Sequence, residues 1–197
     1  VTHDQEEAFA VSDHVGVFKE GRLEQWDTPY NLYHEPLTPF VASFIGQGYF
    51  IRGQLLSPDT VQTELGVIRG NRAYQWPTGS AVDVLLRPDD VVHDDASEVK
   101  ARVVHKSFRG AEFLYTLELD SGKQVLSLVP SHHDHHVGEW VGIRAEVDHV
   151  VTFPRVAAAK DEAEARSLVE KQIQAGLLLA LPLLAALLTM GRVCIHW

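Results

Sequence analysis

The side chains with the clearest capacity for chemistry stand together in one short segment, residues 131–136. Four histidines and one carboxylate occupy consecutive positions there: His132, His133, Asp134, His135 and His136. Imidazole nitrogens and carboxylate oxygens bind borderline metal ions such as Zn²⁺, Ni²⁺ and Fe²⁺. Successive side chains of an extended segment point to opposite faces, so these groups cannot all converge on one ion. Two interpretations therefore stay open, a metal site and a solvated polar loop.

A second candidate is His3, which stands directly before an acidic helix opening at residues 4–7. An imidazole suits contact with a phosphate, because it can donate a hydrogen bond to a phosphate oxygen and changes its charge near physiological pH. Taken by itself, the His-Asp pair is more typical of a histidine that merely precedes a helix. The elements that follow His3 decide between these two interpretations.

Those elements form a recognisable order of helices and strands. The pattern of apolar and turn residues predicts helix, strand, strand, helix and helix over residues 8–11, 15–19, 22–26, 30–34 and 40–45. The pairs Thr28-Pro29 and Thr38-Pro39 each supply an N-cap and a proline at the first helical position. Pro36 ends the first of these two helices.

This order resembles the segment that follows the switch histidine of ABC transporter ATPases. The resemblance implies that His3 is a catalytic, nucleotide-binding residue, which contacts the γ-phosphate of ATP and senses it across a dimer interface. It implies three kinds of partner: a second ATPase subunit in a homodimer, membrane permease subunits and, indirectly, a periplasmic solute-binding protein.

The parts that such an ATPase needs for turnover do not occur in this sequence. ATP hydrolysis requires a P-loop that cradles the phosphates, and a strand-end Asp and Glu that hold Mg²⁺ and activate water. Residues 16–21 have the glycine spacing of a P-loop, but Arg22 and Leu23 follow where Lys and Ser or Thr are required. The signature motif is missing as well. ATP and Mg²⁺ are expected as cofactors of a longer parent, whereas the chain alone is expected to be inactive and to need no cofactor.

Composition narrows the class of partner. The net charge of −10 at pH 7 argues against nucleic acid, because neutralising phosphates requires clustered Lys and Arg. The single cysteine, Cys194, leaves no internal disulfide framework and suits a reducing compartment. The hydrophobic share of 45% is enough for a core.

Residues 48–154 change to short apolar runs separated by turn residues. Residues 113–119 and 124–128 flank an Asp-Ser-Gly-Lys turn and predict a β-hairpin. Six or more strands in about a hundred residues favour a small barrel.

The sequence Val-Leu-Leu-Arg-Pro-Asp-Asp-Val at residues 84–91 resembles the Arg-Pro-acidic motif of the TOBE domain, an accessory barrel of importer ATPases that is similar to the OB-fold. Arg87 and Pro88 suit a structural role, in which the proline fixes a strand exit while the arginine satisfies carbonyls or pairs with Asp89 or Asp90. The resemblance implies that the barrel either supports the dimer or binds a regulatory ligand, and the fold alone does not choose.

The transported solute is suggested by resemblance only. Residues 84–90 and 131–135 look most like the ferric-iron branch of these ATPases. Ferric iron itself prefers harder oxygen ligands than imidazole, so the likeness concerns the branch and not the ligand of the loop. An importer of polyamine, sulfate or sugar is the alternative within the family. Outside it stand a regulatory module for a metal or oxyanion, and a dimerisation domain without a ligand.

Residues 156–197 are expected to form a helical tail. Residues 157–174 are strong helix formers with a charged surface, and residues 175–190 carry no charge. Extended to residues 173–191, the apolar run approaches the roughly 20 residues of a spanning helix. Membrane anchoring, packing against a partner and a tail foreign to the family all stay open.

Together these patterns predict an α+β chain in three parts. Residues 1–47 are expected to be the C-terminal end of a P-loop ATPase domain, residues 48–155 an OB-like TOBE β-barrel, and residues 156–197 the helical, apolar tail. The expected function is that of the C-terminal part of the ATP-binding subunit of an ABC importer, which couples ATP binding and hydrolysis to solute uptake. Its expected place is peripheral, on the cytoplasmic face of the inner membrane.

Overall fold

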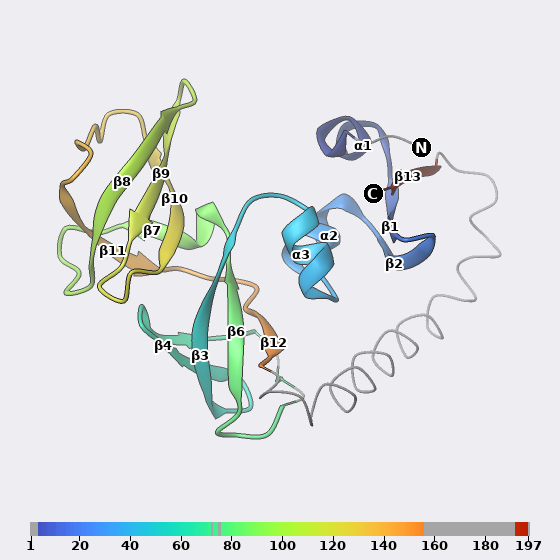
Figure 1. The fold of residues 1–197 in the computed structure, drawn as a ribbon, viewed down its shortest axis with the longest axis horizontal. Coiled ribbons are helices and arrows are strands. Elements are labelled where there is room, and N and C mark those ends of the chain that lie inside the picture. Colours follow the sequence, from blue (N-terminus) through green and yellow to red (C-terminus); the bar gives the residue numbers. More distant parts are fainter. Residues whose placement is uncertain (1–3, 72, 75, 156–191, 197) are drawn as a thin grey trace. The chain divides into compact units, whose positions relative to one another are not determined.

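The computed structural model describes residues 4–71, 73–74, 76–155 and 192–196 (Figure 1). The chain divides into two compact units, one made of Val1–Gly46 with Val156–Trp197 and the other of Gln47–Arg155. His3 and the apolar segment 173–191 lie outside the described residues. Among the described helices, none combines the length and the apolar character needed to cross a membrane.

The first unit opens with a capped helix and a hairpin. Helix α1 (Gln5–Val11) begins at Asp4, whose carboxylate accepts a hydrogen bond of 3.0 Å from the backbone N–H of Glu7. Strands β1 (His14–Lys19) and β2 (Arg22–Asp27) pair antiparallel. Their turn places Gly21 at a φ of 75°, which glycine adopts without a Cβ penalty. The P-loop-like glycine spacing therefore belongs to a hairpin.

Two short helices follow, and both begin as their Thr-Pro pairs predict. In α2 (Pro29–His34) the hydroxyl of Thr28 accepts the backbone N–H of Asn31 at 3.2 Å. In α3 (Pro39–Phe44) Thr38 accepts the backbone N–H of Val41 at the same distance. Six fully buried side chains form the core of this unit: Ala8, Val15, Val17, Leu32, Val41 and Ile45.

The prediction of a helical tail is wrong for residues 192–196, the part of that tail which the structure describes. Residues Arg192–His196 form strand β13, which pairs parallel with β1, His14 lying opposite Arg192. Valine and isoleucine at positions 193 and 195 favour a strand because their branched side chains suit a pleated surface. The order of this described sheet is β13-β1-β2.

The second unit contains a first sheet whose described strands are ordered β12-β6-β3-β4-β5, each neighbouring pair antiparallel. The strands are β3 (Tyr49–Ser57), β4 (Thr60–Thr63), β5 (Gly66–Arg69), β6 (Ala81–Leu86) and β12 (Val151–Pro154). After β6 a single turn of 3-10 helix, η1 (Pro88–Asp90), leads into the second sheet.

That second sheet has the described order β10-β9-β8-β11-β7, again with antiparallel neighbours. The strands are β7 (Val91–His93), β8 (Lys100–Phe108), β9 (Glu112–Glu118), β10 (Gln124–Pro130) and β11 (Trp140–Ala145). The predicted hairpin is confirmed: β9 and β10 pair from Glu118 and Gln124 at the turn to Glu112 and Pro130.

One hydrophobic core joins the two sheets. It combines buried residues of β3 and β6, such as Ile51 and Leu86, with residues of the second sheet, such as Tyr115, Leu117 and Ile143. All five are at most 1% exposed. Two antiparallel sheets around one core form the small all-β, OB-like barrel that the sequence predicts.

Candidate functional site

Three half-buried histidines meet where the end of β7 approaches the loop between β10 and β11. His93 is the last residue of β7, and His133 and His135 lie in the loop between β10 and β11. Each offers one ring nitrogen, and the three nitrogens lie within 4.8 Å of one another. The rings of His133 and His135 lie 5.2 and 4.8 Å from the ring of His93, measured between centroids. We call these three residues the histidine triad.

The loop divides the residues of the predicted metal segment between its two faces. His133 and His135 are half-buried, whereas the intervening and flanking residues His132, Asp134 and His136 are exposed. This alternation is what an extended segment imposes on successive side chains. The structure therefore brings two of the five candidates together and leaves the other three outside the triad.

Each of those three outer residues has a different neighbour. The ring of His132 lies 4.3 Å from that of His133. The Asp134 carboxylate accepts a hydrogen bond from the ammonium group of Lys106, which lowers the pKa of Asp134 and raises that of Lys106. His136 is 89% exposed, and its Nδ1 lies 3.8 Å from a carboxylate oxygen of Glu139.

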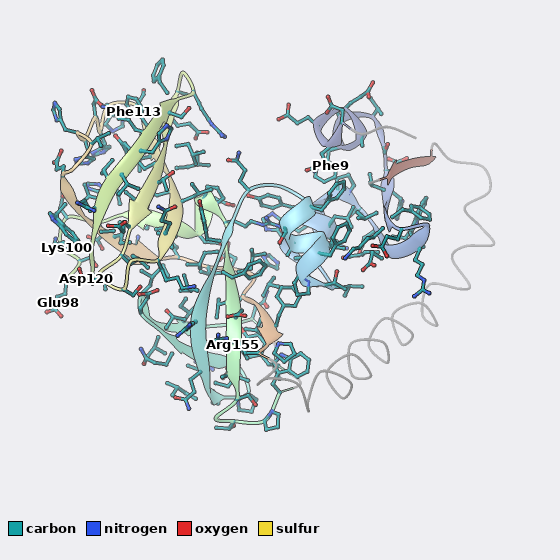
Figure 2. The ribbon with its side chains drawn as sticks, viewed as in Figure 1. Phe9, Glu98, Lys100, Phe113, Asp120 and Arg155 are labelled. Atoms are coloured by element: carbon teal, nitrogen blue, oxygen red, sulfur yellow. The ribbon has the colours of Figure 1, made fainter. Side chains whose placement is uncertain are left out.

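Tyr115 fixes the backbone of the loop. It lies on β9, the strand whose Phe113 is labelled in Figure 2, and is 1% exposed. Its hydroxyl donates to the carbonyl oxygen of His133 at 2.9 Å and accepts the backbone N–H of His135 at 3.0 Å. Because one buried phenol bonds to both residues, the spacing between His133 and His135 is set from the core of the barrel.

Glu139 orients His135 from the other side. One carboxylate oxygen lies 3.0 Å from Nδ1 of His135, and the other accepts the backbone N–H of His136 at 2.8 Å. These bonds hold the pKa of Glu139 below its ordinary value. The bond from the backbone of His136 has the larger effect and the bond to His135 the smaller. Val103 of β8 in turn donates its N–H to the carbonyl of Glu139 at 2.9 Å. The ring of His135 is thus held with Nδ1 on the carboxylate and Nε2 on the opposite edge.

His93 enters the triad through strand pairing. On β7 it lies opposite Ile143 of β11, and the next residue, Asp94, donates its N–H to the carbonyl of Gly142 at 2.9 Å. Gly142 has no room for a side chain, because a Cβ there would overlap the carbonyl oxygen of Asp94. The His93 side chain is 12% exposed. The sequence did not predict this residue as part of a site, since only the pairing of β7 with β11 brings it to the loop.

Two ring nitrogens of the triad are buried without a hydrogen bond. Nε2 of His93 and Nε2 of His135 have no hydrogen-bond partner among the described residues. The exposed carboxylate of Asp95 comes within 3.1 Å of Nε2 of His93, but not in hydrogen-bond geometry. Buried polar atoms are nearly always satisfied in folded proteins, so both nitrogens need an explanation.

Within the triad, the surroundings of His133 favour its uncharged form. Burial lowers the pKa of His133, and the neighbouring rings of His132, His93 and His135 lower it further. A neutral imidazole keeps a lone pair on one nitrogen, which is the form that binds a metal ion. The neighbouring histidines therefore make His133 a better ligand.

The Arg-Pro motif lies apart from the triad, at the crossing between the sheets. Arg87 is 3% exposed, and its Nη1 donates to the carbonyl of Gln47 at 3.3 Å. Pro88 begins η1, and the backbone N–H of Arg87 donates to a carboxylate oxygen of Asp90 at 2.7 Å. Desolvation raises the pKa of Asp90 to about 7, against the lowering effect of that hydrogen bond. The side chains of Arg87 and Asp90 thus both bond to backbone groups.

Comparison with protein families places most of these features in one domain. The family model described as TOBE domain matches residues 84–153, a span that includes the Arg-Pro motif and the histidine triad. The second unit is therefore a TOBE barrel, and this is the class that the fold defines.

The chain also resembles curated ATP-binding proteins of importers. It is 35% identical over 136 residues to the spermidine/putrescine import ATP-binding protein PotA of Marinobacter nauticus, covering 64% of this chain and 36% of that protein. Against PotA of Bacteroides fragilis it is 34% identical over 149 residues, or 73% of this chain and 31% of the relative. The chain thus spans about a third of the length of the curated relatives it matches.

These matches support a C-terminal ABC ATPase region that includes a TOBE domain. They give no support to the predicted ferric-iron branch. A solved structure of the cytoplasmic molybdate-binding protein ModG matches with a TM-score of 0.44 and 12% identity, covering 53% of this chain and 94% of that one. A likeness of this degree has no bearing on function.

Proposed function

We propose that this chain belongs to the ATP-binding subunit of an ABC importer, which couples ATP binding and hydrolysis to solute uptake. The observation that carries the proposal is the similarity of 136 residues to import ATP-binding proteins, in a chain whose capped helices and hairpin precede a TOBE barrel. The subunit works as a homodimer on the cytoplasmic face of the inner membrane, against permease subunits that receive solute from a periplasmic binding protein.

In this function His3 contacts the γ-phosphate of ATP. The support is its place in the sequence directly before Asp4, the N-cap of α1, whose carboxylate accepts the backbone N–H of Glu7. ATP and Mg²⁺ are bound by the subunit through a P-loop and carboxylates that these 197 residues do not contain. The chain alone therefore hydrolyses no ATP.

For the solute we favour a polyamine, because the relatives are named for import of spermidine and putrescine. Ferric iron, suggested by the sequence of residues 84–90 and 131–135, is the second candidate. The two solutes differ enough for one uptake assay to separate them.

The test uses the subunit that contains this chain, reconstituted with its permease in proteoliposomes. We expect ATP-dependent uptake of radiolabelled spermidine, with both uptake and hydrolysis abolished by His3→Ala. His105→Ala, at an exposed position of β8, is the matched control and should leave both intact.

Three results would contradict parts of the proposal. Uptake of ferric iron without spermidine would overturn the solute. Normal hydrolysis in the His3→Ala subunit would overturn the role of that residue. Turnover by the purified chain at the rate of the intact subunit would overturn the whole assignment.

A further inference from the structure

We propose that His93, His133 and His135 of the TOBE barrel form a binding site for a first-row transition-metal dication, with Zn²⁺ as the reference ion. The juxtaposition that carries the proposal is of three ring nitrogens within 4.8 Å of one another, brought together from β7 and from the loop before β11. The geometry of this site does not depend on the identity of the transported solute.

The spacing of the nitrogens suits a site that closes on its ion. At the usual Zn–N distances, two nitrogens of a tetrahedral site lie about 3.3 Å apart. The triad nitrogens must therefore approach one another by about 1.5 Å at most. Side chains can move this far within the breadth of their rotamer wells. Three imidazoles then fill three positions of a tetrahedron, and the fourth is open to water or a further ligand.

The unsatisfied nitrogens point to the same site. Nε2 of His93 and Nε2 of His135 are buried and make no hydrogen bond within the described part of the chain. A solvated polar loop would leave such atoms to water, whereas here they lie in the same cluster as the ring of His133. A bound cation accepts the lone pairs of both nitrogens at once. One ligand thus satisfies two ring nitrogens that make no hydrogen bond among the described residues, of which Nε2 of His93 otherwise has only the Asp95 carboxylate within 3.1 Å.

The surroundings of His135 are those of a metal ligand. Metal-bound histidines almost always place their second ring nitrogen against a carboxylate, a carbonyl or water, which fixes the tautomer and the orientation of the ring. Glu139 does this for Nδ1 of His135 at 3.0 Å. Tyr115 fixes the backbone of the same residue, so the backbone position of His135 and the partner of its Nδ1 are set before an ion arrives.

Ligand chemistry narrows the kind of ion. The donors are nitrogens, which suit Zn²⁺, Ni²⁺, Co²⁺ and Cu²⁺ better than the hard cations Mg²⁺ and Ca²⁺ or ferric iron. The carboxylates of Asp95 and Glu139 add negative charge beside the triad, 3.1 and 3.0 Å from nitrogens of His93 and His135. A dication is thus matched in both ligand type and charge.

The competing explanation is that the histidine-rich loop binds metal loosely through adjacent residues, without His93. The two explanations are separated by calorimetry. The purified 197-residue chain is stripped of metal with EDTA and then titrated with Zn²⁺ alone. We expect one ion per chain. His93→Ala should weaken binding by more than about 100-fold, because it removes a direct ligand that lies outside the loop. The exposed loop residue His132 gives the matched control, and His132→Ala should bind as the wild type does.

Two further measurements test the geometry. Co²⁺ should give the intense visible absorption of a tetrahedral site in the wild type and lose it in His93→Ala. Glu139→Gln keeps the shape of the side chain but removes its charge, so it should weaken binding by roughly 10- to 100-fold while circular dichroism stays unchanged.

Several outcomes would overturn the proposal. These are the absence of saturable binding, equal affinity in wild type and His93→Ala, or a larger loss in His132→Ala than in His133→Ala. None of these measurements involves ATP, a permease or a transported solute, so their failure is distinct from failure of the proposed function.

Discussion

The strongest prediction about stability concerns Asp90, at the crossing between the two sheets of the barrel. Its carboxylate accepts the backbone N–H of Arg87 at 2.7 Å, yet desolvation raises its pKa from 3.8 to about 7. A carboxyl whose pKa rises on folding holds its proton more tightly in the native state than in the unfolded one. Its contribution to stability is therefore fully present below about pH 4, falls as the pH rises toward 7, and is constant above that.

The magnitude follows from the size of this shift. At 1.36 kcal/mol for each pKa unit, the rise from 3.8 to about 7 corresponds to a loss of about 4 kcal/mol between pH 4 and pH 8. This is an upper bound, because Asp90 is only half-buried and solvent screens part of its charge. Asp90→Asn removes the titration while keeping an oxygen that can accept the N–H of Arg87.

The assay is urea unfolding of the barrel at several pH values between 4 and 8, with EDTA present to exclude metal effects. The free energy of unfolding of Asp90→Asn minus that of the wild type should rise with pH by up to about 4 kcal/mol. Asp120→Asn, in the exposed turn between β9 and β10 (Figure 2), is the control and should show a much smaller change. A flat difference for Asp90→Asn, or one that falls as the pH rises, would refute the reasoning.

Three further substitutions test the support of the triad and the core. Tyr115→Phe removes both hydrogen bonds to the loop, so the free energy of unfolding should fall by about 1–3 kcal/mol and the affinity for Zn²⁺ should weaken. Urea unfolding and calorimetry measure these two effects. Tyr49→Phe is the control and should match the wild type in both assays. Leu117→Ala leaves a cavity in the barrel core and should lower the free energy of unfolding in urea by about 2–5 kcal/mol. The side chain of Leu56 is 48% exposed, so the control Leu56→Ala should lower it by only about 0.5 kcal/mol. Gly142→Ala forces the carbonyl of Asp94 away from β11, so it should lower the free energy of unfolding by about 1–3 kcal/mol and speed hydrogen exchange at the amide of Asp94. An unchanged exchange rate would contradict the close approach of Gly142 and Asp94.

The parts of the fold that local chemistry determines could be predicted from the sequence. Thr28 and Thr38 cap their helices because the cap needs only a hydroxyl and an N–H three residues on. The hairpin of β9 and β10 was equally local, since its turn residues and alternating strands are adjacent in the chain. The order of the sheets was not predictable in this way, because it depends on pairings such as β7 with β11 that join distant residues.

The candidate site shows the same division. Alternation along an extended segment required that the five consecutive candidates separate onto two faces, and the structure does separate them. What the sequence did not reveal was which face turns inward, because that depends on Tyr115 and Glu139. His93 lies forty positions before His133 in a strand of three residues, so no spacing rule connects the two. The sequence signal that could have indicated His93 as a candidate ligand was its place directly before Asp94 and Asp95.

The pairing of β13 with β1 has a consequence for the solubility of the chain. With β13 on one side and β2 on the other, β1 is an interior strand, and its backbone N–H and C=O groups are satisfied along both edges. Removing residues 192–196 would convert β1 into an edge strand with Val15 and Val17 beside an open row of donors and acceptors. Such an edge is a template for pairing with another molecule. Deletion of these five residues is therefore expected to favour self-association, visible by light scattering as growth in particle size with protein concentration.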